Sequence, residues 1–292
     1  MFVRSAAFVF PFLCASAAFA QDAPAVPEQA ATQEQASVAR EGDSRLTIGA
    51  GAAYYPDYEG SSHNRWSPIP AANGTVAGMS FTVLANRASI DVVPDGTGPG
   101  WDFQLGPVAV LNMNRSNRDA IRDLRVRRLG EIDTSVEVGA YAGIGYTGLI
   151  TSDFDKLSLS VSYRKGISGA NRSGVWNPVL TYTTPLSTRA LVSIFTSAEI
   201  AEDRYARLYF GVTPAQSLAS GLPAFRPQGG QKDISFGGFF TYALTGNLTK
   251  GLSLVVGGTY KKLVGDFADS PIVSIAGDRK QWTGAAGLAL TF

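Results

Sequence analysis

The chain has 292 residues, of which 45% are hydrophobic, 17% are charged and 32 are glycine, and it contains a single cysteine. This charged fraction is low, because about a quarter of the residues of a typical soluble protein are charged. The balance of 25 basic and 24 acidic residues gives no indication of a nucleic-acid partner. Outside the extreme N-terminus, no run of about 18 apolar residues predicts a helical span. Two classes stay open: a soluble all-β protein, or a barrel that hides its hydrophobicity in alternation.

Residues 1–20 predict a cleaved secretory signal peptide. Arg4 supplies the basic region, residues 6–13 form a short apolar core, and Ala18-Phe19-Ala20 matches a cleavage site. Cys14 lacks the small preceding residue of a lipoprotein signal and is expected to leave with the peptide. Cleavage also removes Arg4, one of the 25 basic residues, which leaves 24 basic and 24 acidic residues. The mature chain then lacks cysteine, which excludes disulfides, thiol catalysis and a redox role.

Residues 21–44 form a segment rich in Ala, Gln, Pro and Glu, without aromatic residues or apolar periodicity. Such a segment buries too little surface to offset its chain entropy, so it predicts a disordered periplasmic arm. The arm is interpreted as a spacer, with a tether for a periplasmic partner as the alternative.

From residue 45 to residue 292, apolar residues recur at every second position, as in Leu157, Leu159 and Val161 against Ser158 and Ser160. Most alternating segments run for about 10–13 residues, the length that a tilted membrane strand needs. Strands are predicted at 45–55, 66–77, 80–93, 101–113, 131–146, 156–166, 174–184, 189–199, 231–244, 251–262 and 281–292. The pattern indicates an all-β fold: a transmembrane, antiparallel, up-and-down β-barrel.

These are eleven segments, whereas a bacterial single-chain barrel has an even number of strands. Tyr205–Val212 also alternates and is the candidate for a twelfth strand, so twelve strands are predicted, with ten as the alternative. Tight periplasmic turns are expected at 78–79, 185–188 and 245–247. Extracellular loops are expected at 56–65, 94–100, 200–230 and 263–280.

The last strand carries the most specific signal. Trp282 and Phe292 lie on its apolar face, ten residues apart, and a tilted strand of that length spans roughly 25 Å, the height of the apolar band between two aromatic girdles. A terminal aromatic residue in this setting resembles the assembly signal of outer-membrane barrels. Phe292 is therefore expected to engage the barrel-assembly machinery, and the predicted location is the outer membrane, with its lipid as a partner.

Several short segments together resemble the MltA-interacting protein family, MipA/OmpV, over nearly all of the mature chain. The segments are Pro56-Asp57-Tyr58-Glu59-Gly60-Ser61, Tyr205 with Tyr209-Phe210-Gly211-Val212, Ser220-Gly221-Leu222-Pro223-Ala224-Phe225, and Ala268-Asp269-Ser270-Pro271-Ile272-Val273 after Leu263-Val264-Gly265-Asp266. The resemblance implies an outer-membrane barrel. The named member is taken to scaffold a murein hydrolase and a murein synthase, and relatives have been linked to adhesion and permeation.

Three non-enzymatic functions follow as hypotheses. The first is a scaffold of the cell envelope that contacts periplasmic murein enzymes, as the resemblance implies. The second is a narrow pore, suggested by the small residues Gly49, Gly51, Gly287 and Ala289 on the lumen face, and the third is an adhesin acting through the late loops. No catalytic, cofactor or metal site is predicted.

His63, the only histidine, lies beside Ser61 and Ser62, and a Ser–His pair is the machinery of lipid hydrolases. Adjacent loop residues seldom reach the required geometry, so His63 is interpreted as a polar loop residue. One histidine without cysteine also argues against a transition-metal site.

Two further clusters have a structural and a functional interpretation. Residues 115–131 contain the basic residues Arg115, Arg118, Arg122, Arg125, Arg127 and Arg128, interleaved with Asp119 and Asp123, which predicts a short salt-bridged helix or else a docking surface. The late-loop residues Asp203, Tyr205, Tyr209, Ser220 and Asp269 are expected to pack the loops, with a small pocket in the barrel mouth as the alternative.

Overall fold

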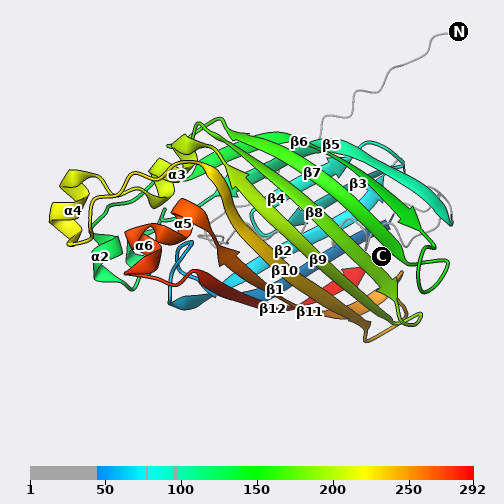
Figure 1. The fold of residues 1–292 in the computed structure, drawn as a ribbon. Helices are drawn as coiled ribbons and strands as arrows, with labels where there is room; N and C mark the ends of the chain where they lie inside the picture. The colour runs from blue at the N-terminus through cyan, green and yellow to red at the C-terminus, as the bar shows by residue number, and fades with distance from the viewer. Residues whose placement is uncertain (1–44, 77, 95–97) are drawn as a thin grey trace, which may run out of the picture.

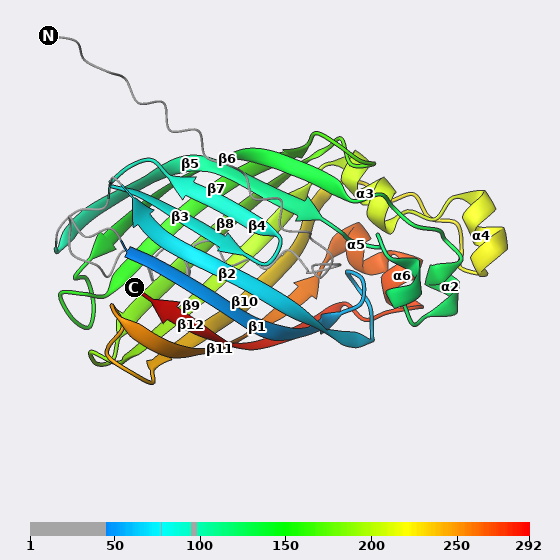
Figure 2. The same ribbon diagram turned by 180° about the vertical axis from the view of Figure 1, so that it is seen from behind.

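A computed structural model describes residues 45–292 except 77 and 95–97. Twelve antiparallel strands form a closed barrel in which each strand pairs with its neighbours in sequence, and β1 closes the ring against β12 (Figures 1 and 2). The strands are β1 (Arg45–Pro56), β2 (Asn64–Val76), β3 (Met79–Leu84), β4 (Arg87–Asp91), β5 (Gly100–Asn112), β6 (Ser135–Thr147), β7 (Lys156–Gly166), β8 (Gly174–Pro185), β9 (Ala190–Ala201), β10 (Gly230–Ala243), β11 (Gly251–Leu263) and β12 (Lys280–Thr291). The predicted twelve-stranded up-and-down barrel is confirmed. The predicted signal peptide and arm lie outside the described residues.

The count of twelve is right, but one predicted strand is wrong. Tyr205–Val212 does not form a strand, because Asp203–Phe210 is the helix α3. The twelfth strand comes instead from the segment predicted as 80–93, which divides into β3 and β4. Ala85 takes a left-handed backbone with φ of 51°, and the side-chain amide of Asn86 donates to the carbonyl of Leu111 at 2.7 Å. Asn is a common turn residue, and here the turn at Ala85 and Asn86 reverses the chain within the barrel wall.

The outward face of the barrel is apolar and ends in two aromatic girdles. Large apolar side chains such as Ile48, Phe103, Leu180, Phe236 and Leu288 are exposed on it. The girdle at one end consists of the ring pairs Tyr54–Trp66, Tyr163–Trp176 and Tyr260–Trp282, and the other contains Trp101–Tyr146 and Phe240–Tyr242. A continuous apolar belt of this size between aromatic rings fits a lipid bilayer.

The seam that closes the barrel depends on glycine. Gly51 of β1 lies opposite Gly287 of β12. A Cβ atom added to Gly51 would lie 2.4 Å from the carbonyl oxygen of Ala286, and one added to Gly287 would lie 2.8 Å from that of Ala50. Both contacts are with backbone, so a side chain at either position would push the two strands apart.

The helices gather at one end of the barrel, and both described chain ends lie at the other (Figure 1). The helical segments are η1 (Arg118–Ala120), α2 (Leu124–Arg127), α3 (Asp203–Phe210), α4 (Pro214–Ser220), α5 (Gly265–Asp269) and α6 (Pro271–Ser274). In the described part of the chain, every helix falls short of the length and apolar character that crossing a membrane requires. Short turns of such barrels are periplasmic and long loops extracellular, which makes the helical end the outer one.

One loop was predicted at the wrong end. Residues 94–100 were expected outside, but β4 ends and β5 begins at the end that also holds the β2–β3 turn and the start of β1. The error arises because residues 80–93 were predicted as one strand. The division into β3 and β4 adds a chain reversal, so the chain reaches residue 94 at the opposite end of the barrel from the one predicted. The Arg-rich segment 115–131, whose side the sequence left open, lies at the helical end between β5 and β6.

Candidate functional site

The loops at the outer end fold into a cap with two hydrophobic clusters. The inner cluster joins the wall residues Val175 and Leu263 to Tyr209, Phe210 and Phe267 of the helices. The outer cluster consists of Tyr58, Ile121, Val126, Leu129, Val212, Leu222, Ile272 and Ala276. Four different loops contribute to these clusters, so the outer end carries a packed unit instead of four separate loops.

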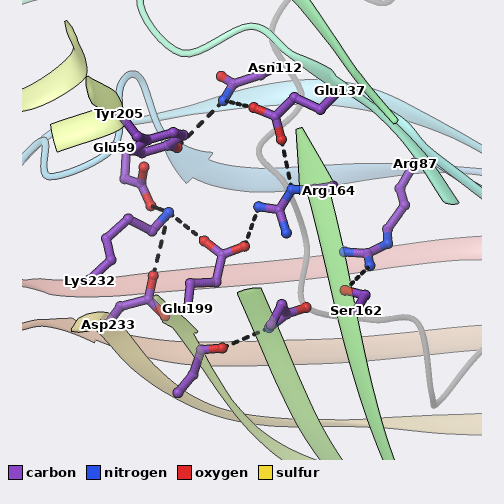
Figure 3. Close-up of polar contacts among 12 residues, drawn as sticks. Glu59, Arg87, Asn112, Glu137, Ser162, Arg164, Glu199, Tyr205, Lys232 and Asp233 are labelled. Carbon is purple, nitrogen blue, oxygen red and sulfur yellow. Dashed lines mark hydrogen bonds and ion pairs between the residues drawn. The ribbon is translucent and has the colours of Figure 1, made fainter. Parts of the chain in front are cut away.

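Beneath the cap, charged side chains of the barrel wall form a buried network (Figure 3). Arg164 of β7 donates through Nε to Glu137 at 2.7 Å and through Nη2 to Glu199 at 2.5 Å. Glu199 also pairs with Lys232 of β10. Lys261 of β11 lies 3.5 Å from Asp233, which places charges from five strands at one level of the lumen.

Two elements of the cap are attached to this network. Glu59, in the loop between β1 and β2, accepts from Lys232 Nζ at 2.6 Å and from Lys261 Nζ at 3.3 Å. The ring of Tyr205 on α3 lies 5.3 Å from Lys232 Nζ, and its hydroxyl accepts from the Asn112 amide at 3.4 Å. The same ammonium group therefore holds a loop and a helix against the wall.

A β-bulge explains how Lys232 reaches the network. The register of β10 against β9 shifts between Gln231 and Asp233. Both Lys232 and Asp233 are consequently buried, although neighbouring strand residues ordinarily point to opposite faces. Bulges are used in this way to redirect a side chain.

The network contains a carboxylate cluster but no free place for a metal ion among the described side chains. One oxygen each of Glu59, Glu199 and Asp233 lie within 4.8 Å of one another. Lys232 Nζ lies among them, 2.6 Å from Glu59 and 3.6 Å from Asp233. The ammonium group supplies the positive charge that these three carboxylates need.

Glu59 is charged at neutral pH. Burial opposes ionisation of its carboxyl, but the ammonium groups of Lys232 and Lys261 outweigh this and hold the pKa of Glu59 below its ordinary value of 4.5. Its attraction to the wall is therefore complete at neutral pH and is lost only in acid, as the pH falls through that lowered pKa.

The family-motif positions lie mostly in the cap. The Tyr58 hydroxyl donates to the carbonyls of Ile272 and Ala276 at 3.2 and 3.0 Å, and Ser270 Oγ donates to the carbonyl of Phe210 at 2.6 Å. Three of the remaining positions lie at the ends of elements: Pro56 ends β1, Gly211 follows α3 and Pro271 begins α6. Gly60 and Gly221 have positive φ angles of 97° and 77°, and Ser61 and Val212 form isolated β-bridges with Gly277 and Phe225. Tyr205 lies on α3, Ser220 forms a hydrogen bond within α4, and Pro223 and Asp269 are exposed.

The late-loop residues do not share one pocket. Tyr205 and Tyr209 pack against each other with ring centroids 4.6 Å apart. Asp203 accepts from the amide of Gly229 at 2.8 Å, Ser220 donates to Gln216 within α4, and Asp269 is exposed. The arrangement corresponds to the expected packing of loops.

The Arg-rich segment forms a short salt-bridged helix, with one exception. Asp123 caps α2 and lies 2.7 Å from Arg125, and Asp119 lies 3.0 Å from Arg127. Arg115, in contrast, is buried and donates to the carbonyls of Tyr209 and Gly130, both at 3.3 Å. Burial lowers the pKa of Arg115 to about 10, so this cation stays charged at neutral pH and ties the segment to α3.

His63 is an exposed loop residue. Its Nδ1 lies 3.3 Å from Ser62 Oγ, and its backbone amide donates to Ser61 Oγ at 3.0 Å. Both side chains of the Ser62–His63 pair are exposed to solvent, and the contact joins sequence neighbours. The geometry is that of a loop turn.

Sequence reasoning missed the buried network, although part of its signal is visible. Glu137, Arg164, Glu199 and Lys261 all stand at positions where the alternation points inward. A charge at such a position must meet a partner in the lumen, since an unpaired buried charge is costly. Lys232 has the parity of the lipid face, and only the bulge brings it inside.

The family model described as MltA-interacting protein MipA matches residues 48–292. The chain belongs to the MipA family. This match covers the cap and all of the described barrel except residues 45–47, and it confirms the predicted family and the outer-membrane class of barrel. No match is found among curated proteins.

Solved structures similar to this MipA-family chain are outer-membrane porins and channels. The NanC porin has a TM-score of 0.41 at 7% identity, over 85% of this chain and 99% of the porin. The CymD monoaromatic hydrocarbon channel has a TM-score of 0.41 at 8% identity, over 92% and 93%. An outer-membrane channel of Pseudomonas putida F1 has a TM-score of 0.39 at 12% identity, over 87% of this chain and 97% of the channel. At these identities the likeness concerns the barrel alone.

Proposed function

We propose that this MipA-family barrel is a non-enzymatic interaction protein of the cell envelope whose lumen is closed at its outer end. The observation that carries the proposal is the burial of the network. Glu137 and Arg164 are each 1% exposed and Lys232 is 2% exposed, although all three face the lumen. Glu59 and Tyr205 of the cap lie against Lys232 on this wall, and the burial of the network beneath them supports a closed outer end.

The partner that we propose is a periplasmic murein enzyme, the hydrolase named in the family description or an associated synthase. The candidate contact surface is the turn between β6 and β7 at the periplasmic end. It presents three exposed apolar side chains, Leu149 at 50%, Ile150 at 63% and Phe154 at 65%. Exposed apolar groups that lie together on an ordered turn favour a protein contact.

Asp155 holds this turn in one conformation. Its carboxylate accepts from the amides of Leu149, Ile150 and Thr151 at 3.0, 2.9 and 2.9 Å, and from the Tyr182 hydroxyl at 2.9 Å. A preorganised surface loses little entropy on binding, which supports its use as a docking site. The arm formed by residues 21–44 is the other proposed periplasmic contact.

The test is recovery of murein enzymes from envelope extracts with the full mature chain. The double variant Ile150→Ser with Phe154→Ser should lose that recovery. Leu218→Ser is the matched control, because Leu218 is 90% exposed on α4 at the opposite end. Recovery of no murein enzyme by the unmodified protein, or equal recovery by the double variant, would count against this function or this surface, respectively.

A narrow pore is the alternative function. Gly49, Gly51, Gly287 and Ala289 line a lumen cavity, which is the observation that favours it. Conductance across a planar bilayer separates the two functions, since a closed barrel carries no steady current.

An adhesin is a third candidate, favoured by the exposed Leu218 on the outer cap. Loss of surface attachment in Leu218→Ser, with attachment retained in the Ile150→Ser, Phe154→Ser double variant, would support it. This substitution is sharper than trimming residues 212–230, because Val212 and Leu222 are buried in the cap.

For export and assembly, we propose cleavage after Ala20 and recognition of Phe292 by the barrel-assembly machinery. Phe292 is 63% exposed, and its amide donates to the carbonyl of Leu46 at 3.0 Å. Removing Phe292 alone should lower the amount of mature protein in the outer membrane, measured by immunoblot of sedimented membranes.

A further inference from the structure

The lumen contains a cavity on the side formed by β1, β2, the end of β3, β10, β11 and β12. Its volume is about 120 Å³. Its lining runs along β1 from Thr47, near the periplasmic end, to Ala53. The cavity is separate from the charged network and from the exposed surfaces considered above.

The lining of this cavity is largely apolar, which is unusual for the inside of an outer-membrane barrel. Ile69, Leu84, Phe239 and Val255 line it together with glycine and alanine residues. Thr47, one of its few polar residues, shares a hydrogen bond of 2.9 Å with Thr291. Barrel interiors are ordinarily polar because they hold water, so this lining is matched to a solute with little polarity.

One aromatic ring, that of Phe239, lines the cavity and is backed by a second ring. The rings of Phe195 and Phe239 are stacked, with centroids 6.0 Å apart and an interplanar angle of 15°. Two glycines make room for them: a Cβ atom at Gly257 would lie 2.2 Å from Phe239 Cδ1, and one at Gly237 would lie 2.6 Å from Phe195 Cζ. The rings therefore occupy the space that side chains at these two glycines would take, and Phe239 also lines the cavity.

We propose that this cavity binds a small, neutral, apolar molecule with a single aromatic ring. An apolar protein cavity of about 150 Å³ stays dry and binds benzene. The present cavity is of similar size and is also lined mostly by apolar groups, but it is partly open instead of enclosed. A ring of this size can stack on or meet the edge of Phe239, as aromatic pairs prefer. A charged or strongly polar solute would lose its hydration there without compensation.

The test uses crystals of the full mature protein soaked with iodobenzene, whose iodine gives an anomalous signal. The expected result is an iodine peak in the lumen beside Phe239. Ala285→Leu should abolish the peak, because Ala285 lines the cavity and the added atoms would fill it. Ala52→Leu is the matched control. Ala52 lies on β1, the neighbour of β12, but its side chain is exposed on the lipid face, so the iodine peak should remain in this variant.

A solution measurement accompanies the soak and excludes binding at crystal concentration only. Fluorobenzene binding is followed by fluorine NMR in nanodiscs, with empty nanodiscs subtracted. Ala285→Leu should bind about tenfold more weakly than the unmodified protein or Ala52→Leu. Phe239→Ala, which enlarges the cavity, should admit 1-iodonaphthalene, which the unmodified protein should exclude.

Three outcomes would overturn the proposal: no iodine peak in the unmodified protein, a peak that survives in correctly folded Ala285→Leu, or equal fluorobenzene binding by all three proteins. If Ala285→Leu fails to fold, the Phe239→Ala result decides. Exclusion of 1-iodonaphthalene by Phe239→Ala would then contradict the proposed site.

Discussion

Arg164 is the residue on which the charged network depends most. It is fully enclosed and pairs with both Glu137 and Glu199. Arg164→Met leaves two buried carboxylates without this partner, and removing one member of a buried ion pair costs about 3–5 kcal/mol. We expect a loss of that size in the free energy of unfolding, measured in urea with the barrel in lipid vesicles.

Arg207→Met is the matched control for this prediction. Arg207 pairs with Asp203 at 3.2 Å on the exposed face of α3. Exposed pairs contribute little to stability because solvent screens them, so this variant should unfold almost as the unmodified protein does. Equal losses in the two variants would show that the buried network has no special role in stability.

Asp155 gives the β6–β7 turn a pH-dependent stability. Burial raises the pKa of its carboxyl, but hydrogen bonds from Thr151, Tyr182, Ile150 and Leu149 outweigh this and hold the pKa below its ordinary value of 3.8. Its contribution is therefore complete above that value and is lost as the pH falls through the lowered pKa. Asp155→Asn should cost about 2 kcal/mol at pH 7.

The measurement for Asp155 is the difference in unfolding free energy between the unmodified protein and Asp155→Asn as a function of pH. We expect a constant difference from pH 8 to about pH 5 and a decline in stronger acid. A difference that stays constant into strong acid would contradict the proposed hydrogen bonding.

At the residue scale, alternation predicts which side chains face the lumen but not which of them meet. The inward positions of Glu137 and Arg164 follow from parity alone. The position of Lys232 does not, because a one-residue bulge reverses its face without any signal in the local sequence. Glu59 belongs to a loop, whose return to the wall depends on contacts far apart in the chain.

At the scale of elements, α3 shows why a short segment can be assigned wrongly. Ala206, Leu208, Phe210 and Val212 alternate as in a strand. The buried residues of α3 are instead Tyr205, Ala206, Tyr209 and Phe210. They form two adjacent pairs four positions apart, which is the spacing of one face of a helix. Both periods fit eight residues, and packing of the helix into the cap decides between them.

Cysteine labelling tests the helix directly. In a strand, positions 207 and 209 would share one face, whereas in α3 Arg207 is exposed and Tyr209 is buried. We expect rapid maleimide labelling of Arg207→Cys and strong protection of Tyr209→Cys. The only cysteine of the chain, Cys14, lies in the predicted signal peptide, so background labelling of the mature protein should be low. Equal labelling at the two positions would contradict the helix.

The long strands were predictable, since each keeps its alternation over many residues. β3 and β4 were not, because both are short and the turn at Ala85 carries no glycine or proline. The signal for this turn is Asn86 alone, which is too weak to divide an otherwise continuous segment.

At the scale of the whole molecule, the sequence pattern predicts a barrel because long segments alternate between an apolar face and a small or polar face. It does not predict the cap, whose hydrophobic clusters combine four loops separated by long stretches of chain. The cap packs over a buried ion-pair network of the barrel wall and is joined to it through Glu59 and Tyr205. The central claim is therefore that this MipA-family barrel is closed at its outer end.

Conductance of the purified protein in a planar bilayer tests this claim most directly. The double variant Tyr205→Ala with Phe210→Ala, which removes two buried anchors of the cap, serves as the comparison. We predict no steady current from the unmodified protein and stepwise openings from the variant. Stable openings of the unmodified protein, equal to those of the variant, would contradict a closed barrel.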